Sequence, residues 1–265
     1  MSIIKVDGLV KKFGDFTAVN GISFDVSQGD IFAFLGPNGA GKTTTIKILT
    51  TLLHPTSGYV DLAGFDTARQ QSDVRKSFGI VFQDPSLDDE LTAFENLELH
   101  GVLYAVPKKL RRERMEQLLK FVDLWERKDD QVKHFSGGMK RRLEIARGLL
   151  HHPKILFLDE PTQGLDPQTR NHIWSYIKDL NAKEGITVFF TTHYMDEADR
   201  VARTVAVIDH GNIVAQGTPE ELKKQANAEN FEDAFLNLTG HEIRDEEASG
   251  ADAMRMHRKM WGGRR

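Results

Sequence analysis

The chain has 265 residues, of which 40% are hydrophobic and 28% charged, and its 35 Lys and Arg against 39 Asp and Glu give a net charge of −4. This length suits one large domain or two small ones with a sizeable core. The charge gives no overall attraction to nucleic acid, and the absence of cysteine excludes disulfides, thiolate metal sites and cysteine nucleophiles. The start has no signal-peptide core and no stretch reaches the ~18 apolar residues of a membrane span, so we expect a soluble chain.

Short strands are predicted for residues 3–35. Apolar and polar side chains alternate before and after Asn20-Gly21, which we interpret as a connecting turn. Residues 31–35 form an unbroken apolar run, which is typical of a strand covered on both faces. A glycine-rich turn follows, and residues 42–53 then carry a helical pattern.

Strands and helices continue to alternate up to about residue 240. Charged amphipathic helices dominate from about residue 87 to residue 150. The other predicted elements are strands at 59–62, 79–82, 155–158 and 188–190, helices over 108–125 and 167–181, and a hairpin of 205–208 with 213–215. Buried strands that alternate with helices predict an α/β layered fold, and the lack of an internal repeat predicts one such unit.

The composition changes again in residues 241–265. Residues 242–252 hold five acidic residues and one arginine, and residues 255–265 hold five basic residues and no acid. Two interpretations stay open for this segment. It is either a solvated, flexible tail or a basic end that rests on anionic lipid.

Residues 36–43, Gly-Pro-Asn-Gly-Ala-Gly-Lys-Thr, fit the phosphate-binding pattern G-x-x-x-x-G-K-[ST] between a buried strand and a helix. Glycines let the backbone N–H groups turn inward, where these groups and the helix N-terminus attract phosphate oxygens. Lys42 adds a positive charge at the β and γ phosphates, and Thr43 offers its hydroxyl to Mg²⁺. The residues predicted to contact the nucleotide here are Gly36, Pro37, Asn38, Gly39, Ala40, Gly41, Lys42, Thr43 and Thr44.

Two carboxylates, Asp159 and Glu160, directly follow the apolar run of residues 155–158. The carboxyl ends of parallel strands gather where ligands bind. Asp159 can hold Mg²⁺, and Glu160 can polarise an attacking water. Taken alone, the pair could be two acids that start a loop before Pro161. The phosphate-binding pattern upstream favours the nucleotide site.

Residues 135–139, Phe-Ser-Gly-Gly-Met, stand between these two sites at the start of a predicted helix. A serine and two glycines at a helix start make a second anion site. The run resembles the LSGGQ signature of the ATP-binding cassette (ABC) ATPases, and its first and last residues are similar to the form seen in export-type cassettes. The resemblance implies that Ser136, Gly137 and Gly138 bind the γ-phosphate.

Further motifs that resemble those of the ABC family are present in order. Gln83 matches the glutamine that senses Mg²⁺ and the γ-phosphate in that family and faces the transporter. Asp166 lies in a Gly-Leu-Asp run that resembles the D-loop, and His193 matches the switch histidine. Phe13 stands where the family places an aromatic that stacks on adenine. Core packing is the alternative for Phe13, and Phe16 is then the next candidate.

The resemblance covers about residues 2–240 and implies one ABC ATPase domain. The implied fold is that of a P-loop NTPase: a RecA-like α/β core with a mainly parallel sheet, an N-terminal antiparallel β subdomain, and an inserted α-helical signature subdomain at about residues 87–150. Runs at 82–87, 91–97 and 231–236 look like those of the daunorubicin-resistance type of ABC exporter ATPase. In that type the membrane permease is usually a separate chain.

We therefore expect a subunit that binds and hydrolyses ATP with Mg²⁺ and energises an exporter from the cytoplasmic face of the cell membrane. The resemblance implies that ATP is held between two cassettes, which are two copies of this chain or a paralogous pair. Glu160 is then the general base, and Lys42, Gln83 and His193 assist it.

The alternative is a soluble ABC ATPase that acts on nucleic acid or ribosomes. The basic run of residues 108–114 is the only feature in its favour, and no aromatic is interleaved in that run for base stacking. The chain has one cassette, no cysteine and no long heptad run, unlike many proteins of that class. We therefore expect no nucleic acid partner.

Overall fold

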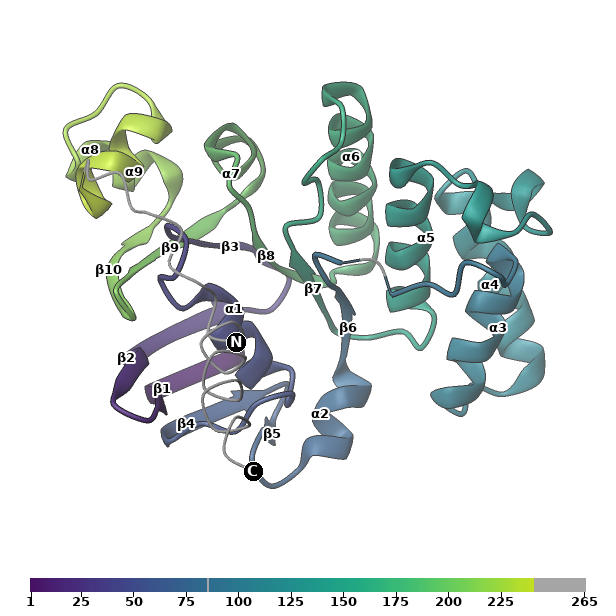
Figure 1. Ribbon diagram of the computed structural model, residues 1–265, viewed down its shortest axis with the longest axis horizontal. Helices are drawn as coiled ribbons and strands as arrows, with labels where there is room; N and C mark the ends of the chain where they lie inside the picture. The colour runs from purple at the N-terminus through teal and green to yellow at the C-terminus, as the bar shows by residue number, and fades with distance from the viewer. Residues whose placement is uncertain (85, 241–265) are drawn as a thin grey trace, which may run out of the picture.

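The computed structural model describes residues 1–84 and 86–240, and the charged segment 241–265 lies outside the described residues. Two sheets with helices around them build the molecule (Figure 1). One sheet is antiparallel and N-terminal, and the other is mainly parallel. The α/β class expected from the sequence is therefore confirmed.

The antiparallel sheet has the order β2-β1-β4-β5. Its strands are β1 (Ser2–Phe13), β2 (Phe16–Ser27), β4 (Ser57–Leu62) and β5 (Phe65–Asp66). The second sheet has six strands in the order β10-β9-β3-β8-β7-β6, and only its β9–β10 hairpin is antiparallel. Its strands are β3 (Ile31–Leu35), β6 (Phe78–Val81), β7 (Ile155–Asp159), β8 (Thr187–Thr191), β9 (Thr204–Asp209) and β10 (Asn212–Gly217).

The chain reverses between β1 and β2 at Gly14 and Asp15, so the predicted turn at Asn20-Gly21 was wrong. Asn20 and Gly21 lie inside β2, where the register against β1 shifts. The backbone N–H of Asn20 donates to the carbonyl of Gly211 at 2.8 Å. This bond ties the strand to the distant β9–β10 hairpin, and the local sequence carries no information about that partner.

Most helices pack on the two sheets, and α3 and α4 form a separate layer with α5 to one side. They are α1 (Lys42–Leu49), α2 (Gln71–Ser77), α3 (Ala93–Leu103), α4 (Lys108–Phe121), α5 (Gly137–Leu149), α6 (Pro167–Glu184), α7 (Met195–Val201), α8 (Pro219–Gln225) and α9 (Phe231–Thr239), with short 3₁₀ turns at Trp125–Arg127 and Val132–His134. The helix predicted over 42–53 ends at Leu49, because the N–H groups of Leu52 and Leu53 turn back to the carbonyl of Lys47. The helix predicted over 108–125 ends at residue 121.

Aromatic side chains join the two sheets face to face. The ring of Phe24 in β2 lies 5.7 Å from that of Phe32 and 5.5 Å from that of Phe34, both in β3. The opposite face of the parallel sheet packs on α5, α6 and α7. A third cluster of buried side chains comes from α3, α4, α5 and the segments next to them, so the helical layer has a core of its own. Figure 1 shows α3 and α4 beyond α5, on the side away from the sheet.

Helix α5 lies on β6 with backbone against backbone. A Cβ atom on Gly79 of β6 would lie 2.1 Å from the carbonyl oxygen of Gly148 in α5, so no larger residue fits at position 79 without a shift. The packed elements β6 and α5 each position residues of the predicted site. Strand β6 leads directly to Gln83, and the first turn of α5 contains Gly137 and Gly138.

Candidate active site

The predicted phosphate-binding residues form the turn between β3 and α1. Glycine is required at two of these positions. A Cβ on Gly36 would lie 2.2 Å from the carbonyl oxygen of Ile208, and Gly41 has φ 110° with its Cβ position 2.5 Å from the carbonyl oxygen of Ala18. The side chains of Asn38 and Thr43 are exposed. The turn is therefore held closely against β2 and β9 while its outer face stays open to a ligand.

Lys42 begins α1, and its side chain folds back over the turn. The residue is 7% exposed, and Nζ donates to the carbonyl oxygens of Gly36 at 2.7 Å and Pro37 at 3.1 Å. Burial lowers the pKa of Lys42, and the carboxylates of Glu160 and Asp159 act in the opposite direction. A cation at this place is directed at the loop whose N–H groups attract phosphate.

Asp159 and Glu160 lie at the end of β7 and are both buried. Oδ1 of Asp159 accepts from the Thr191 hydroxyl, which ends the neighbouring strand β8, at 2.7 Å. The N–H of Glu160 donates to the same hydroxyl at 3.1 Å, and Glu160 has φ 50°, in the left-handed region. Burial raises the pKa of Asp159, whereas the Thr191 bond and Lys42 lower it. Thr191 was not predicted as a site residue, yet it orients both acids.

His193 contacts Glu160 directly. Its Nε2 lies 2.6 Å from Oε1 of Glu160, and Oε2 of the same carboxylate is buried with no hydrogen-bond partner among the described residues. One carboxylate oxygen is thus held by the histidine. The other is left to accept a proton from a water or another donor in the site.

Gln83 is exposed and follows β6. Its Nε2 donates to Oε1 of Gln163, three residues after Glu160, at 2.8 Å. The sheet therefore brings the loops that carry Gln83, Lys42, Glu160 and His193 to the carboxyl ends of adjacent strands, where open α/β sheets bind ligands.

The predicted second anion site lies elsewhere on the chain. Ser136 caps α5 by accepting from the N–H of Met139 at 3.3 Å, and a Cβ on Gly138 would lie 2.5 Å from Thr169 of α6. Asp166 in turn caps α6, accepting from the N–H of Thr169 at 3.0 Å. Within residues 1–84 and 86–240, no hydrogen bond or ion pair joins residues 136–138 to the phosphate loop.

The family model for ABC transporters matches residues 19–163, more than half of the chain. The chain belongs to the ABC transporter family. The matched range includes the phosphate loop and the two carboxylates. As a member of this family, the chain is an ABC cassette that binds and hydrolyses ATP. This confirms the family indicated by the sequence.

Two curated relatives of this cassette are slightly more than 40% identical to it over most of its length. The daunorubicin resistance ATP-binding protein DrrA3 of Streptomyces coeruleorubidus is 41% identical over 237 residues, which is 89% of this chain and 74% of that protein. The Nod factor export ATP-binding protein I of Ralstonia nicotianae is 44% identical over 220 residues, which is 83% of this chain and 68% of that protein.

Solved ABC cassettes share the fold. The ATP-binding subunit of an ABC transporter superposes with a TM-score of 0.82 at 27% identity, covering 90% of this chain and all of that one. A dimeric cassette in a post-hydrolysis state, bound to ADP and phosphate, superposes with a TM-score of 0.73 at 29% identity, covering 81% and 98%. The P-loop NTPase fold expected from the sequence is confirmed.

Phe13 and Phe16 of the cassette face each other at the end of the β1–β2 hairpin. Phe13 is half-buried, with Nζ of Lys11 5.0 Å from its ring centroid, whereas Phe16 is 59% exposed. Neither ring belongs to the buried clusters of the described residues. Both aromatic rings therefore remain candidates for adenine stacking.

Sequence reasoning missed Glu197, a buried carboxylate that bonds the residue before His193. It is 1% exposed, and its Oε2 accepts from the hydroxyls of Thr162 at 2.8 Å and Thr192 at 3.1 Å. Thr162 follows Asp159 and Glu160, and Thr192 precedes His193, so the Glu197 side chain ties the two loops together. The only signal in the sequence is an acid four residues after the histidine, at the start of a helix, where a solvated acid is equally expected.

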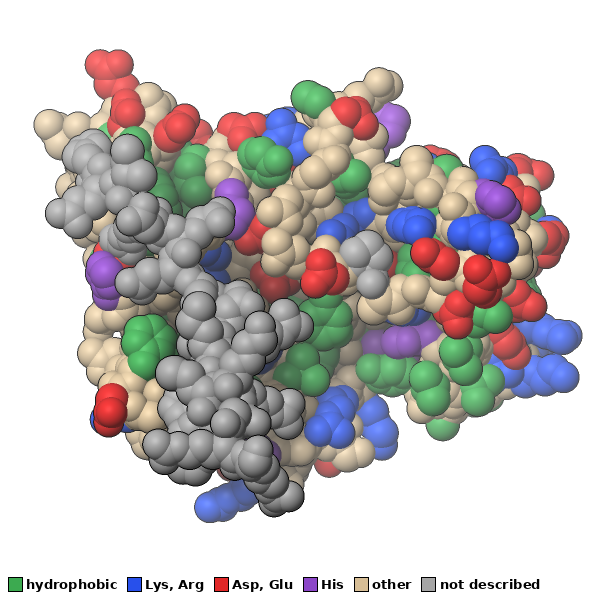
Figure 2. Space-filling view, in the orientation of Figure 1, with side chains coloured by type: hydrophobic (Ala, Val, Ile, Leu, Met, Phe, Trp, Pro, Cys, Tyr) green, Lys and Arg blue, Asp and Glu red, His purple; other side chains and the backbone are tan. Residues whose placement is uncertain are grey.

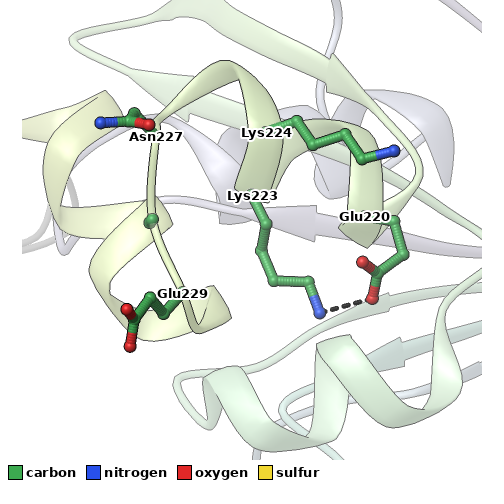
Figure 3. A pocket seen from close by; sticks show the side chains of 6 residues that line it. Glu220, Lys223, Lys224, Asn227 and Glu229 are labelled. Atoms are coloured by element: carbon green, nitrogen blue, oxygen red, sulfur yellow. Dashed lines mark ion pairs between the residues drawn. The ribbon is translucent and has the colours of Figure 1, made fainter.

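A surface hollow beside α8 is distant from this chemistry. It is lined by Glu220, Lys223, Lys224, Asn227, Ala228 and Glu229 (Figure 3). Lys223 already pairs with Glu220 at 2.6 Å and Asp199 at 3.1 Å. No predicted site residue lines it, and we assign it no function.

Proposed function

We propose that this cassette is the energising subunit of an exporter whose membrane permease is a separate chain, with residues 2–240 as the ATPase domain and about residues 87–150 as its helical subdomain. The observation that carries the proposal is the extent of the similarity to cassettes named for drug resistance and Nod factor export, which covers more than four fifths of this chain. These relatives give no support to the alternative of a soluble cassette that acts on nucleic acid or ribosomes. None of the described helices is long and apolar enough to cross a membrane.

ATP hydrolysis follows from the geometry of the buried carboxylate. Oε2 of Glu160 accepts the proton of the attacking water, and His193 holds Oε1 so that the carboxylate keeps its orientation. Lys42 exchanges its loop carbonyls for phosphate oxygens and stabilises the charge that develops on them. Gln83 and Asp159 lie at the carboxyl ends of the adjacent strands β6 and β7, on the same edge of the sheet as Glu160.

Mg²⁺ fits the donors at this place. The Thr43 hydroxyl, the Asp159 carboxylate and the Gln83 amide are hard oxygen ligands, and no group of three or more His, Cys, Asp or Glu side chains in the described residues forms a cage for an ion. A cation held by so few side chains needs phosphate oxygens to complete its shell. When bound, it would neutralise phosphate charge.

Two cassettes share each ATP in this proposal. Ser136 and Gly137 are exposed at the start of α5, where they are available to the nucleotide of a second chain, and Asp166 lies beside them. The solved dimer of a related cassette supports this arrangement. The second cassette is either a copy of this chain or a paralogue.

An apolar surface on α3 supports the permease partner. Leu99, Val102 and Leu103 are 52%, 53% and 73% exposed, and Figure 2 shows hydrophobic side chains gathered over this helix. A contiguous exposed apolar patch of this kind is typical of a protein contact. The proposed partner is a cytoplasmic segment of the permease, which puts the cassette on the cytoplasmic face of the cell membrane.

The test is affinity purification of the tagged cassette from solubilised membranes. We expect a polytopic membrane protein to copurify with the wild type, to be lost with Leu103→Glu, and to be kept with Leu236→Glu, which adds the same charge at an exposed leucine of α9. The ATPase rate of the isolated cassette should not change in either variant. Copurification of ribosomal proteins or nucleic acid with no membrane protein would favour the soluble alternative.

A second measurement assigns the adenine contact. If Phe13 stacks on the base, Phe13→Ala weakens ATP binding by about 1 kcal/mol, the scale of base–aromatic stacking. Turnover at saturating ATP should change less, because the phosphates are held elsewhere. Phe16→Ala is the matched control at the same hairpin. Unchanged affinity in Phe13→Ala together with weaker binding in Phe16→Ala would move the contact to Phe16.

A further inference from the structure

Three charged residues along one face of α5 contact the segment that carries Gln83. Arg141, Glu144 and Arg147 are spaced by three residues, which places them on one side of the helix. Arg141 and Glu144 are buried, at 6% and 0% exposed, although charged side chains are seldom enclosed unless they are paired. Besides the contact between Arg141 and Glu144, their hydrogen-bond partners are Phe82, Gln83 and Ser86, about 60 residues earlier in the chain.

Arg141 makes the most direct contact. Its Nη1 donates to the carbonyl oxygen of Phe82 at 2.5 Å and its Nη2 to that of Gln83 at 3.0 Å. Nη1 also lies 3.1 Å from Oε2 of Glu144. The planar guanidinium thus joins two successive carbonyls of the segment, a geometry that a lysine cannot reproduce.

Glu144 and Arg147 extend the same contact by one turn of the helix. Oε1 of Glu144 accepts from the N–H of Ser86 at 2.8 Å, and Nη1 of Arg147 donates to the carbonyl oxygen of Ser86 at 2.6 Å. Burial lowers the pKa of Arg141 and raises that of Glu144, so each charge would be costly to enclose without its partners.

We propose that Arg141 is a positioning residue that couples Gln83 to the signature residues 136–138 through the body of α5. The residue acts through the backbone of Gln83, whose carbonyl oxygen accepts from its Nη2. Because the signature begins the same helix, any displacement of Gln83 is passed to the surface that holds the second cassette's ATP. This inference rests on the roles given to Gln83 and Ser136 in the proposed function.

The contact is not needed to hold α5 in place. Backbone packing of Gly79 against Gly148 and the buried cluster shared with α3 and α4 already fix the helix. What the guanidinium adds is a fixed relation between the helix and two particular carbonyls. Its loss should lower stability, because Glu144 loses a partner, but should leave α5 in place and free the Gln83 carbonyl.

The test is a double-mutant cycle between Arg141→Met and Gln83→Ala, measured as turnover at saturating ATP. We expect Arg141→Met to lower turnover about tenfold, the scale of one or two lost charge-assisted hydrogen bonds at a reacting geometry, while ATP affinity of the single cassette stays within about twofold. In the Gln83→Ala background the same change should have no further effect, because coupled residues are not additive. Arg141→Lys, which can reach one carbonyl, should recover part of the rate.

Arg142→Met is the matched control. Arg142 is the next residue of α5, but its Nη1 donates to the carbonyl of Val122 within the helical layer at 2.9 Å. This variant should keep wild-type turnover. Because Arg141→Met leaves the buried Glu144 without one partner, each variant is assayed well below its own unfolding temperature.

The outcomes separate the inference from the proposed function. If Gln83→Ala hydrolyses ATP at the wild-type rate, the role proposed for Gln83 fails. If Gln83→Ala is slow but Arg141→Met is normal, or if the two losses multiply in the double variant, the coupling is overturned. Should Arg141→Met fail to fold, Arg141→Lys carries the same cycle.

Discussion

Glu160→Gln is expected to abolish most ATP turnover, by ~10²–10⁴-fold, the usual contribution of a positioned general base. Glutamine is nearly the same size as glutamate, so the Asp159 bond to Thr191 and the bond of the N–H of residue 160 to the same hydroxyl should persist. What disappears is the carboxylate oxygen that has no partner among the described residues. Phosphate release by the purified cassette measures the effect.

The same variant should also accumulate as an ATP-dependent dimer. Because two chains share each ATP in the proposed arrangement, slow hydrolysis keeps the pair closed, whereas the wild type reopens. Light scattering on a sizing column should show a shift from monomer to dimer on addition of ATP. Adding Ser136→Arg should abolish the dimer but not nucleotide binding, since this change blocks the face offered to the second chain.

Two results would contradict this prediction. A Glu160→Gln variant that hydrolyses ATP at the normal rate would remove Glu160 as the base. One that loses turnover yet stays monomeric at high ATP would count against the shared nucleotide and leave the base assignment intact.

Lys42→Ala should lower ATP turnover nearly as much as Glu160→Gln, because it removes a positive charge instead of a base. The phosphates lose a fixed cation, and removal of one stabilising group of this kind costs about 10²-fold or more in rate. The glycine turn itself should survive, because Gly36 and Gly41 are held by their contacts with Ile208 and Ala18. Turnover at saturating ATP and ATP binding should both fall.

Lys47→Ala is the control for Lys42→Ala. Lys47 is exposed in the last turn of the same helix, so its loss changes the charge of α1 and leaves the phosphate loop alone. Wild-type turnover in Lys42→Ala would reject the phosphate-loop assignment altogether.

The elements that could be predicted are those whose signal is local. The apolar runs of residues 31–35 in β3 and 155–158 in β7 are typical of strands covered on both faces, and the residues after each run fall at the sheet edge. Lys42 was predicted from the glycine-rich pattern after the first run, and Asp159 and Glu160 from their place directly after the second. His193 and Gln83 were indicated by the family resemblance and lie at the same edge.

The features that escaped prediction depend on partners far along the chain. Asn20 is held in a strand by Gly211, Thr191 orients acids that lie about 30 residues before it, and Glu197 bonds Thr162. A pattern within a short window does not contain such pairs. The relation proposed between Ser136 and the nucleotide of a second chain needs two chains, so no pattern in one sequence contains it.

The hydrogen bonds of Lys42 to its own loop bear on how tightly a nucleotide is held. A flexible glycine loop loses conformational entropy when it is ordered around a ligand, and this loss reduces affinity. Here the ammonium already bridges the carbonyls of Gly36 and Pro37, so the loop is ordered by an internal partner. When a phosphate binds, its oxygens replace the two carbonyl oxygens as the acceptors of Lys42 Nζ. The affinity is then set by the difference between two sets of hydrogen bonds, with little contribution from ordering the backbone.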